Sequence, residues 1–382
     1  MYVALFAQNN FPEGNMEVPR IKSLARALKA KGLEPSILLS FPNAFNHTFL
    51  NQKKSGHWED IPFQYFSFST RYFPNVFWKI GLFLSYLVRS TLFFLFQHKT
   101  FQIFYLYNPS ITNHLHILWL CKIFQKKVVC DLVELMSTES NNAVHKWEEK
   151  KIVQWGQHHF AISNKLKDHY QNILKAKSVV KSTIMVDLEE FTMAKHTQNK
   201  FTLAYLGSFH SKDQVPLILA AFEQAKQKIK SLQLLLIGYC PWEKELQSKI
   251  NHKGVIYSGR LPRIDIPKWL SKADTFLLCR KKDKFSEYGY PIKLGEYLAM
   301  GQPVILSDLP EYHALFQNEK NCLFFQPNAL NSLVDQIIWR YQNTNKSQNI
   351  GLEGQKTASN YFKEQKVAHE MAEQMVLWGA GS

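Results

Sequence analysis

The chain has 382 residues, of which 46% are hydrophobic and 14% aromatic. It is too long for one typical domain and apolar enough for two packed cores, so its composition excludes a disordered chain. The net charge of +15 is spread over both halves, with 23 Lys and Arg against 14 Asp and Glu in residues 1–199 and 23 against 17 in residues 200–382. Such a surface suits phosphorylated small molecules, anionic lipid or nucleic acid. Nucleic acid is the least favoured, because the basic residues form no compact stripe.

The first half alternates short β-branched or aromatic runs with longer helical stretches. The expected strands are Tyr2–Ala7, Pro35–Ser40, Phe63–Phe68, Ile103–Tyr107, Val128–Asp131, His159–Ile162 and Thr183–Val186. The expected helices are Val18–Lys31, Trp78–Gln97, Asn113–Phe124, His145–Trp155 and Lys165–Leu174. Alternation of this kind predicts βαβ units around a parallel sheet.

One apolar segment, Ile80–Gln97, is about as long as the shortest membrane span. Arg89 lies at its centre, where a cation costs about 2.5–3.5 kcal/mol on insertion scales. We therefore expect a helix that packs on the sheet. The alternative is a helix that lies in the membrane interface.

The same alternation restarts after a polar linker at Ala194–Lys200. The expected strands are Thr202–Leu206, Leu232–Ile237, Val255–Ser258, Thr275–Leu278, Pro303–Ser307 and Cys322–Phe325. The expected helices are Gln214–Lys228, Trp242–Asn251, Pro267–Lys272, Ile292–Met300, Leu330–Asn343 and Glu364–Trp378. The fold class is therefore α/β, with two Rossmann-like doubly wound domains whose ligands bind at the carboxyl ends of the strands. We expect an N-terminal domain over residues 1–193, a C-terminal domain over 201–361, and a helix over 362–378 that packs back on the first domain.

Two features of the sequence indicate a cytoplasmic protein. The apolar start, Tyr2–Ala7, has no basic leader and is not typical of a signal peptide. The five cysteines are scattered and form no CxxC pair, which argues against a disulfide framework or a zinc site and favours a reducing compartment.

The spacing around Lys293 and Glu296 is the strongest sign of chemistry. The two residues are three apart at the start of an expected helix, just after Pro291, and therefore share one face. The amino end of a helix attracts phosphate, and a carboxylate one turn further can accept hydrogen bonds from the hydroxyls of a ribose. The alternative is an ordinary helix with two surface charges.

The run PIKLGEYLAMGQPVILSD (Pro291–Asp308) resembles the motif P-x-K-x-x-E-x-x-A-x-G-x-P-V of glycosyltransferase family 4, the group 1 glycosyl transferases. That resemblance implies a retaining GT-B enzyme, in which the two Rossmann-like domains face a central cleft and bind acceptor and donor. It implies that Glu296 binds the donor ribose. It further implies that the helix start faces the diphosphate and the sugar, through Gly289, Tyr290, Pro291, Ile292 and Lys293.

Other segments resemble the family more weakly. YLGSFHSKD (Tyr205–Asp213) is similar to the first strand and loop of the donor domain, which implies roles for Gly207, Ser208 and Lys212. MVDLEEF (Met185–Phe191) is similar to the interdomain segment. Gly14 is the glycine of a loop that the family places against the donor phosphates.

The departures from the family pattern lie at the sugar and phosphate positions. Tyr288 stands where many members have a sugar-contacting Glu, with Glu287 beside it. Ser208 replaces the usual Arg after the loop glycine. Arg280, at the carboxyl end of an expected strand, is our candidate for the missing cation, because a departing diphosphate needs preorganised positive charge. The alternative for Arg280 is a solvated basic loop.

The first half offers weaker candidates. Asp131 and Glu134 follow an expected strand and are candidate catalytic carboxylates, or else a capping Asp and a surface Glu. Asn108, Asn113 and His114 follow another strand and are candidates for the acceptor side, although a lone His is more often structural.

The expected function is a retaining transfer of sugar from a nucleoside-diphosphate sugar to a hydroxyl of a glycan acceptor, in the assembly of cell-surface polysaccharide or glycoconjugate. The resemblance implies a transfer without metal, and the sequence shows no Asp-x-Asp or HExxH motif. The basic surface suggests an anionic membrane and a lipid-linked acceptor, and thus a place on the inner face of the cytoplasmic membrane. A sugar-nucleotide epimerase and a non-catalytic binding protein are the alternatives. The sequence leaves open which sugar moves, a hexose or an N-acetylhexosamine.

Overall fold

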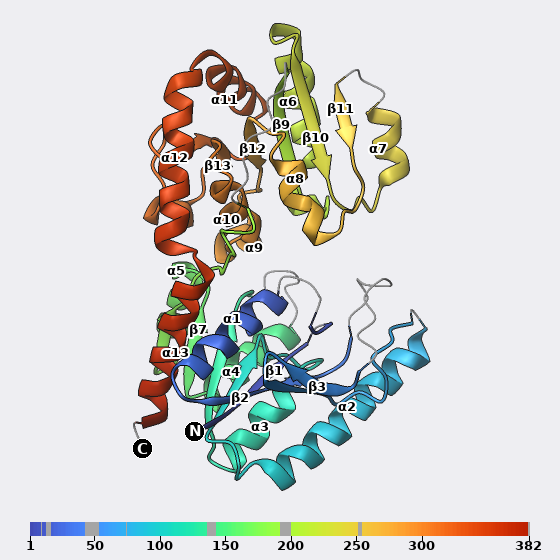
Figure 1. Cartoon of the computed structure of the whole chain (residues 1–382), viewed down its shortest axis with the longest axis vertical. Coiled ribbons are helices and arrows are strands. Elements are labelled where there is room, and N and C mark those ends of the chain that lie inside the picture. Colours follow the sequence, from blue (N-terminus) through green and yellow to red (C-terminus); the bar gives the residue numbers. More distant parts are fainter. Residues whose placement is uncertain are drawn as a thin grey trace. The chain divides into compact units, whose positions relative to one another are not determined.

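The computed structural model describes residues 1–8, 10–12, 17–42, 53–73, 75–135, 143–191, 200–250 and 254–380. The chain forms two compact units, each built on its own sheet (Figure 1). The first unit contains Met1–Met185 and Glu364–Ser382, and the second contains Val186–Lys363. The first unit thus ends at 185 rather than at 193, and the segment after Met185 belongs to the second unit. Most of the expected linker, residues 194–199, lies outside the described residues.

The first unit is built on an eight-stranded sheet in the order β3-β4-β2-β1-β5-β6-β7-β8. Its strands are β1 (Tyr2–Ala7), β2 (Glu34–Leu39), β3 (Ser55–Trp58), β4 (Ile61–Tyr65), β5 (Ile103–Tyr107), β6 (Lys127–Leu132), β7 (His158–Ala161) and β8 (Val179–Lys181). All neighbours pair in parallel except β3, which is antiparallel to β4. The expected strand at Thr183–Val186 is wrong, because pairing with β7 already ends at Lys181.

Helices cover both faces of this sheet (Figure 1). They are α1 (Glu17–Ala30), α2 (Val76–Gln97), α3 (Leu115–Ile123), α4 (Ala143–Trp155), α5 (Asn164–Asp168) and α13 (Glu364–Ala380). Although α13 is the last helix of the chain, Val367 and Met371 share a core with Ile21 and Leu24 of α1. Ser23 of α1 also donates a hydrogen bond to Glu364. The C-terminal helix thus completes the core of the first unit.

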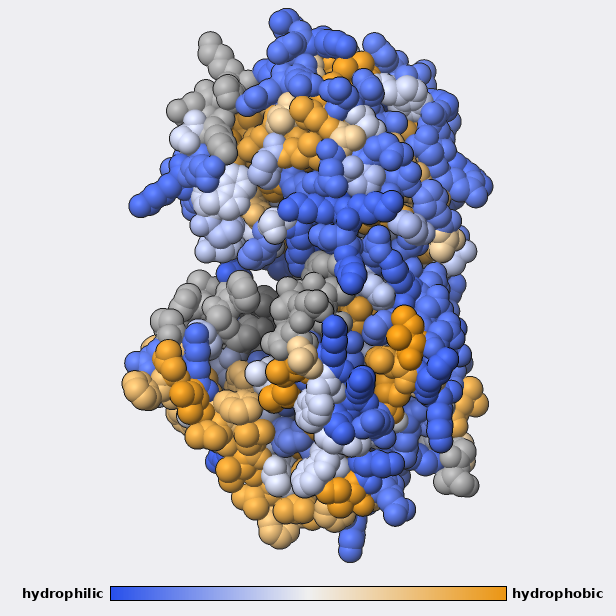
Figure 2. All heavy atoms as spheres, turned by 180° about the vertical axis from the view of Figure 1, so that it is seen from behind, coloured by the Kyte–Doolittle hydropathy of each residue, from blue (hydrophilic) through white to orange (hydrophobic). Residues whose placement is uncertain are grey.

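Helix α2 packs on the fold by one face only. Its buried residues, Leu82, Tyr86, Ser90 and Phe94, follow each other at four-residue intervals. The opposite face is apolar as well, and Figure 2 shows a band of hydrophobic side chains along the edge of the first unit that α2 forms. Among the described residues, α2 is the one helix long and apolar enough to cross a membrane.

The second unit is built on a six-stranded sheet in the order β11-β10-β9-β12-β13-β14, and all its neighbours are parallel. Its strands are β9 (Phe201–Leu206), β10 (Leu232–Ile237), β11 (Val255–Tyr257), β12 (Thr275–Leu278), β13 (Val304–Ser307) and β14 (Leu323–Phe325), each at its predicted position. The order reverses between β9 and β12, the point at which doubly wound sheets bind their ligands.

The helices of the second unit include two that the sequence pattern did not predict. The helices are α6 (Val215–Lys228), α7 (Glu243–Lys249), α8 (Ile266–Leu270), α9 (Lys284–Tyr288), α10 (Ile292–Ala299), α11 (Leu330–Gln342) and α12 (Thr344–Tyr361). The polar, glycine-containing sequence of α12 disfavours an isolated helix. Packing explains it: a Cβ on Gly351 would lie 2.4 Å from the carbonyl oxygen of Gly301, and one on Gly354 would lie 2.8 Å from Leu298. Glycine lets α12 approach α10 closely, and this contact stabilises the helix.

Candidate active site

A cluster of charged side chains lies where the strand order of the second unit reverses. Gly207 follows β9, and the chain then turns through a short 3-10 segment that ends at Asp213. Arg280 follows the neighbouring strand, β12, by two residues. Lys293 comes from the first turn of α10, whose amino end is preceded by Pro291. Three separate chain segments therefore contribute charge to one edge of the sheet.

Asp213 is the centre of this cluster. Its Oδ1 lies 2.8 Å from Nζ of Lys293 and 3.8 Å from Nε of Arg280. The hydroxyl of Tyr205 lies 3.4 Å from the same Lys293 nitrogen. Asp213 is 2% exposed and Arg280 8% exposed. The backbone N–H of Arg280 donates to Ser307 Oγ at 2.7 Å, which fixes the position of the main chain at the end of β12.

The cluster explains why residue 207 is glycine. A Cβ at this position would lie 2.1 Å from the Tyr205 hydroxyl and 2.6 Å from Lys293 Nζ. Any side chain here would displace the ammonium group from the end of the strand. Residue 207 is therefore glycine for a local steric reason, and the structure brings Gly207, Arg280 and Lys293 together.

Burial and charge oppose each other in this cluster. Burial lowers the pKa of Lys293 to about 8, Arg280 adds to the decrease, and Asp213 opposes it. Burial would raise the pKa of Asp213, but Lys293 and Arg280 together hold it below its ordinary value. Two cations against one carboxylate leave a net positive charge at the ends of the strands. Such a site can bind an anion, and phosphate is one of the anions that Arg and Lys side chains recognise.

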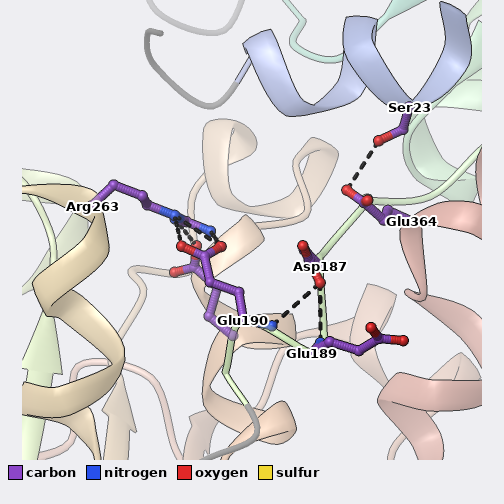
Figure 3. A network of polar contacts seen from close by, with 7 residues as sticks. Ser23, Asp187, Glu189, Glu190, Arg263 and Glu364 are labelled. Carbon is purple, nitrogen blue, oxygen red and sulfur yellow. Dashed lines mark hydrogen bonds and ion pairs between the residues drawn. The ribbon is translucent and has the colours of Figure 1, made fainter. Parts of the chain in front are cut away.

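Glu296 lies one turn beyond Lys293 and is 4% exposed. One of its oxygens accepts a hydrogen bond of 2.5 Å from Nη1 of Arg263. The same guanidinium donates to Glu190, with Nη2 2.9 Å from Oε2 (Figure 3). Arg263 also lies over the ring of Phe191, 4.8 Å from its centroid. A single Arg thus joins Glu296 to the segment that resembles the interdomain motif of the family.

The loop before α10 is held by Tyr290. Tyr290 is one of the predicted donor-binding residues; its side chain is 5% exposed, and its ring packs against Tyr312 and Phe362. The aromatic ring therefore belongs to the core below the loop. Glu287 and Tyr288 lie at the end of α9, half-buried. The neighbouring residues Gly289, Pro291 and Ile292 are half-buried too, as are Ser208 and Lys212 in the loop after β9.

In the first unit, the predicted role of Asp131 in catalysis is wrong. Asp131 is fully buried, and its two oxygens face Arg20 at 2.6 and 2.9 Å. The hydroxyl of Tyr105 donates to the same carboxylate. Arg20 donates further to Ser182 and to the carbonyl of Thr183. Asp131 is therefore a structural ion-pair partner that ties α1 to the sheet, whereas Glu134, three residues later, is exposed.

We expect Asp131→Asn to lower the free energy of unfolding by about 3–5 kcal/mol, because it leaves the buried Arg20 charge without its counterion. Urea unfolding followed by tryptophan fluorescence measures the loss. The control is Glu134→Gln, which should stay within about 0.5 kcal/mol of the wild type, as exposed substitutions do. Equal stabilities of the two variants would contradict the structural role of Asp131.

The acceptor-side candidates of the first unit are mostly buried. His114 has no exposed surface, and its Nδ1 lies 2.7 Å from the hydroxyl of Tyr86. Burial lowers the pKa of His114 well below its ordinary value, and His116 adds to the decrease. A neutral, enclosed imidazole that joins α2 to the helix after β5 is structural, so its predicted place on the acceptor side is wrong. Asn113 is 5% exposed, while Asn108 is half-buried. Gly14 lies outside the described residues.

Sequence reasoning missed Asp213, Tyr205, Arg263 and Glu190 as members of the site. Asp213 and Tyr205 are the last and first residues of YLGSFHSKD, so their place next to β9 was already a signal. Arg263 follows β11 by six residues and had no motif to mark it. Among the described residues, no group of three or more His, Cys, Asp or Glu side chains is placed to hold a metal ion.

The comparison with known families bears on this site directly. Residues 200–343 match the family described as glycosyl transferases group 1, a segment that contains β9, β12, α10 and the whole charged cluster. The chain carries a group 1 glycosyltransferase domain. The protein is thus a glycosyltransferase, and Lys293 and Glu296 lie inside its matched domain. No curated protein matches the chain by sequence.

Solved structures show the fold of the whole glycosyltransferase. The sucrose-phosphate synthase of Thermosynechococcus elongatus superposes with a TM-score of 0.79 at 15% identity over 100% of both chains. HepE of Anabaena in complex with UDP has a TM-score of 0.76 at 17% identity, over 99% of this chain and 100% of HepE. Its complex with UDP-glucose has a TM-score of 0.71 at 16% identity, over the same shares. The two Rossmann-like domains of this glycosyltransferase therefore form a GT-B fold.

Proposed function

We propose that this glycosyltransferase moves a sugar from a nucleoside-diphosphate sugar to a hydroxyl of a glycan acceptor, with retention at the anomeric carbon. The observation that carries the proposal is the largely buried group of Lys293, Arg280 and Asp213 at the point where the strand order reverses. In this proposal Glu296, one helical turn further, binds the ribose of the same donor. The first unit supplies the acceptor side in this proposal.

UDP is the first nucleotide to test. The similar structure of HepE binds UDP and UDP-glucose, although its identity to this chain is only 17%. Two largely buried cations suit a diphosphate of any nucleotide, so this cluster does not itself select the base. The choice of UDP rests on the resemblance in fold.

The chemistry that we propose requires positioning and charge rather than a protein nucleophile. The bond between C1 of the sugar and the diphosphate oxygen breaks, and its electron pair passes to that oxygen. Lys293 and Arg280 stabilise the charge that develops there. The acceptor oxygen bonds to C1 on the same face, and its proton passes to the leaving phosphate. Because these two cations neutralise the leaving group, we propose that the transfer needs no metal, and it should persist in EDTA.

The biological setting is part of the proposal. The basic first unit favours an acceptor at an anionic surface, which suits a lipid-linked glycan in the assembly of cell-surface polysaccharide. The five cysteines are free, buried thiols, which suits the reducing side of the cytoplasmic membrane.

The experiment is a panel of UDP-, GDP-, ADP-, dTDP- and CMP-sugars in a thermal shift assay. A donor at 100 times its Kd stabilises the fold by about 2.7 kcal/mol, which gives a measurable rise in Tm. The stabilising donor is then incubated alone with the enzyme and followed by proton NMR. Slow hydrolysis that releases the sugar first in the anomeric form of the donor supports retention.

Three outcomes contradict the proposal. If no nucleotide sugar of the panel raises Tm, the proposed donor site is contradicted. Release of the sugar with the inverted anomeric configuration contradicts retention. Conversion of the donor into an epimer without hydrolysis identifies the protein as an epimerase.

A further inference from the structure

The outer face of α2 carries seven large apolar side chains that the fold leaves exposed. They are Phe77, Ile80, Leu84, Val88, Leu92, Leu95 and Phe96, and we call this set the α2 face. At 100° per residue the set is centred opposite the buried Leu82, Tyr86, Ser90 and Phe94. A helix that is apolar on both faces packs one face on the protein core and needs an apolar environment for the other face.

Polar contacts fix α2 in the first unit. The hydroxyl of Tyr86 is bonded to His114, and Oγ of Ser90 lies 2.8 Å from Nε2 of His116. These partners come from α3 and the residue that precedes it. To cross a bilayer, α2 would have to give up these contacts and the core around Phe94. The helix therefore belongs to the folded unit, and its outer face lies along the surface.

The apolar surface continues onto α3 and the residue after it. Phe124 packs against Phe94, with 5.6 Å between ring centroids, and against His98 at 4.7 Å. Trp119, Ile123 and Phe124 are themselves exposed. Figure 2 shows the resulting band of hydrophobic side chains as continuous along this edge of the first unit. A patch of this kind marks an interaction site.

The chain segment that contains the α2 face carries charge of one sign. Residues 61–130, which include β4, α2, β5 and α3, contain no Asp or Glu and seven Lys or Arg. Five of these cations are exposed, namely Arg71, Lys79, Arg89, Lys99 and Lys122. A surface that is both apolar and purely cationic complements a surface that is apolar inside and anionic outside. An anionic lipid bilayer has that structure.

We propose that the α2 face lies in the headgroup region of an anionic membrane, with the helix axis in the membrane plane. The apolar stripe reaches the acyl chains, and the surrounding Lys and Arg side chains contact lipid phosphates. A second copy of the chain is a poorer occupant, because two such faces would bring their five exposed cations against each other. This membrane contact goes beyond the proposed transfer and does not depend on which sugar moves.

The test is co-sedimentation of the full chain with vesicles of phosphatidylcholine and phosphatidylglycerol at 3:1. The wild type should bind at 50 mM NaCl and bind more weakly at 500 mM. The triple variant Leu84→Gln, Val88→Gln, Leu92→Gln should bind at least about 100-fold more weakly, since each side chain loses its burial in lipid. The variant Lys79→Gln, Lys99→Gln, Lys122→Gln should lose about 100-fold on these vesicles and little on pure phosphatidylcholine.

The matched control is the triple variant Leu352→Gln, Tyr361→Gln, Leu377→Gln, which removes three exposed apolar side chains elsewhere and should bind like the wild type. Hydrolysis of the donor without vesicles should be unchanged in the α2 variant, so loss of binding is separable from failure of the proposed transfer. Three results overturn the proposal. The first is that the wild type does not bind the vesicles, and the second is that the Leu84, Val88, Leu92 variant binds them equally well. The third is that the wild type forms a dimer in solution, that this variant is monomeric, and that neither binds vesicles.

Discussion

Glu296→Gln is expected to lower kcat/KM for the donor by at least about 100-fold. The carboxylate is 4% exposed and, in our proposal, accepts hydrogen bonds from both hydroxyls of the donor ribose. Hydrogen bonds to a charged group contribute about 1.5–3 kcal/mol each, and loss of about 3 kcal/mol corresponds to roughly 100-fold. Steady-state kinetics or donor hydrolysis measures the effect, and isothermal titration with UDP separates binding from turnover.

The contacts of Arg263 provide a matched control for the Glu296→Gln variant. It donates to Glu190 as well as to Glu296, so the Gln variant leaves its charge with a partner and should stay folded. Glu190→Gln removes the other partner of Arg263 and leaves the carboxylate of Glu296 in place. We expect a change in kcat/KM of less than about tenfold for that variant, because the lost pair is half-exposed. If both variants lose the same activity, Glu296 acts through Arg263 and has no direct role at the ribose.

Lys293→Met is expected to lower both activity and stability. Turnover should fall at least about 1,000-fold, as it does when preorganised charge at a developing anion is removed. The free energy of unfolding should fall by about 3 kcal/mol, because Asp213 keeps its buried charge and loses its nearest partner. In the wild type, kcat/KM should fall as the pH rises through about 8, because Lys293 of the enzyme without bound donor loses its proton there.

The double variant Asp213→Asn, Lys293→Met separates the two effects. Removing the second charge should restore most of the stability, since no buried ion is left without its partner. Activity should remain low, because the phosphate still lacks its cation. Recovery of activity in the double variant would show that Lys293 only balances Asp213. Urea unfolding and donor hydrolysis on the same preparations give both readouts.

Much of the fold follows from the pattern of apolar residues. The buried parallel strand Ile103–Tyr107 has a continuous apolar sequence, and Leu232–Ile237 is apolar except for Gln233; both were located correctly. Residues 55–58 form a short edge strand with a half-exposed, polar sequence that periodicity does not distinguish from a loop. Helix α12 was missed for a related reason: its glycines stabilise it through contact with α10, which only the packed structure reveals.

The site was predictable where the motif is long and unpredictable where the sequence departs from it. Lys293, Glu296 and Gly207 were located because the family spacing assigns them to particular turns. Asp131 lies near the carboxyl end of β6 and His114 comes after β5, yet both have buried partners on distant segments, Arg20 and Tyr86. Position after a strand predicts nearness to the edge of the sheet. Only tertiary contacts decide whether a side chain there faces a ligand or the core.

The return of α13 to the first unit makes that unit discontinuous in the chain. The two segments that leave and re-enter it are adjacent within the second unit, where the N–H of Val186 donates to the carbonyl of Phe362. During synthesis the ribosome therefore makes the whole second unit before it makes Val367, Met371 and Met375, which complete the first core. The second unit can fold before α13 is available to complete the core of the first unit. A fragment that stops before residue 364 would retain the group 1 domain and leave the apolar surface of α1 open to aggregation.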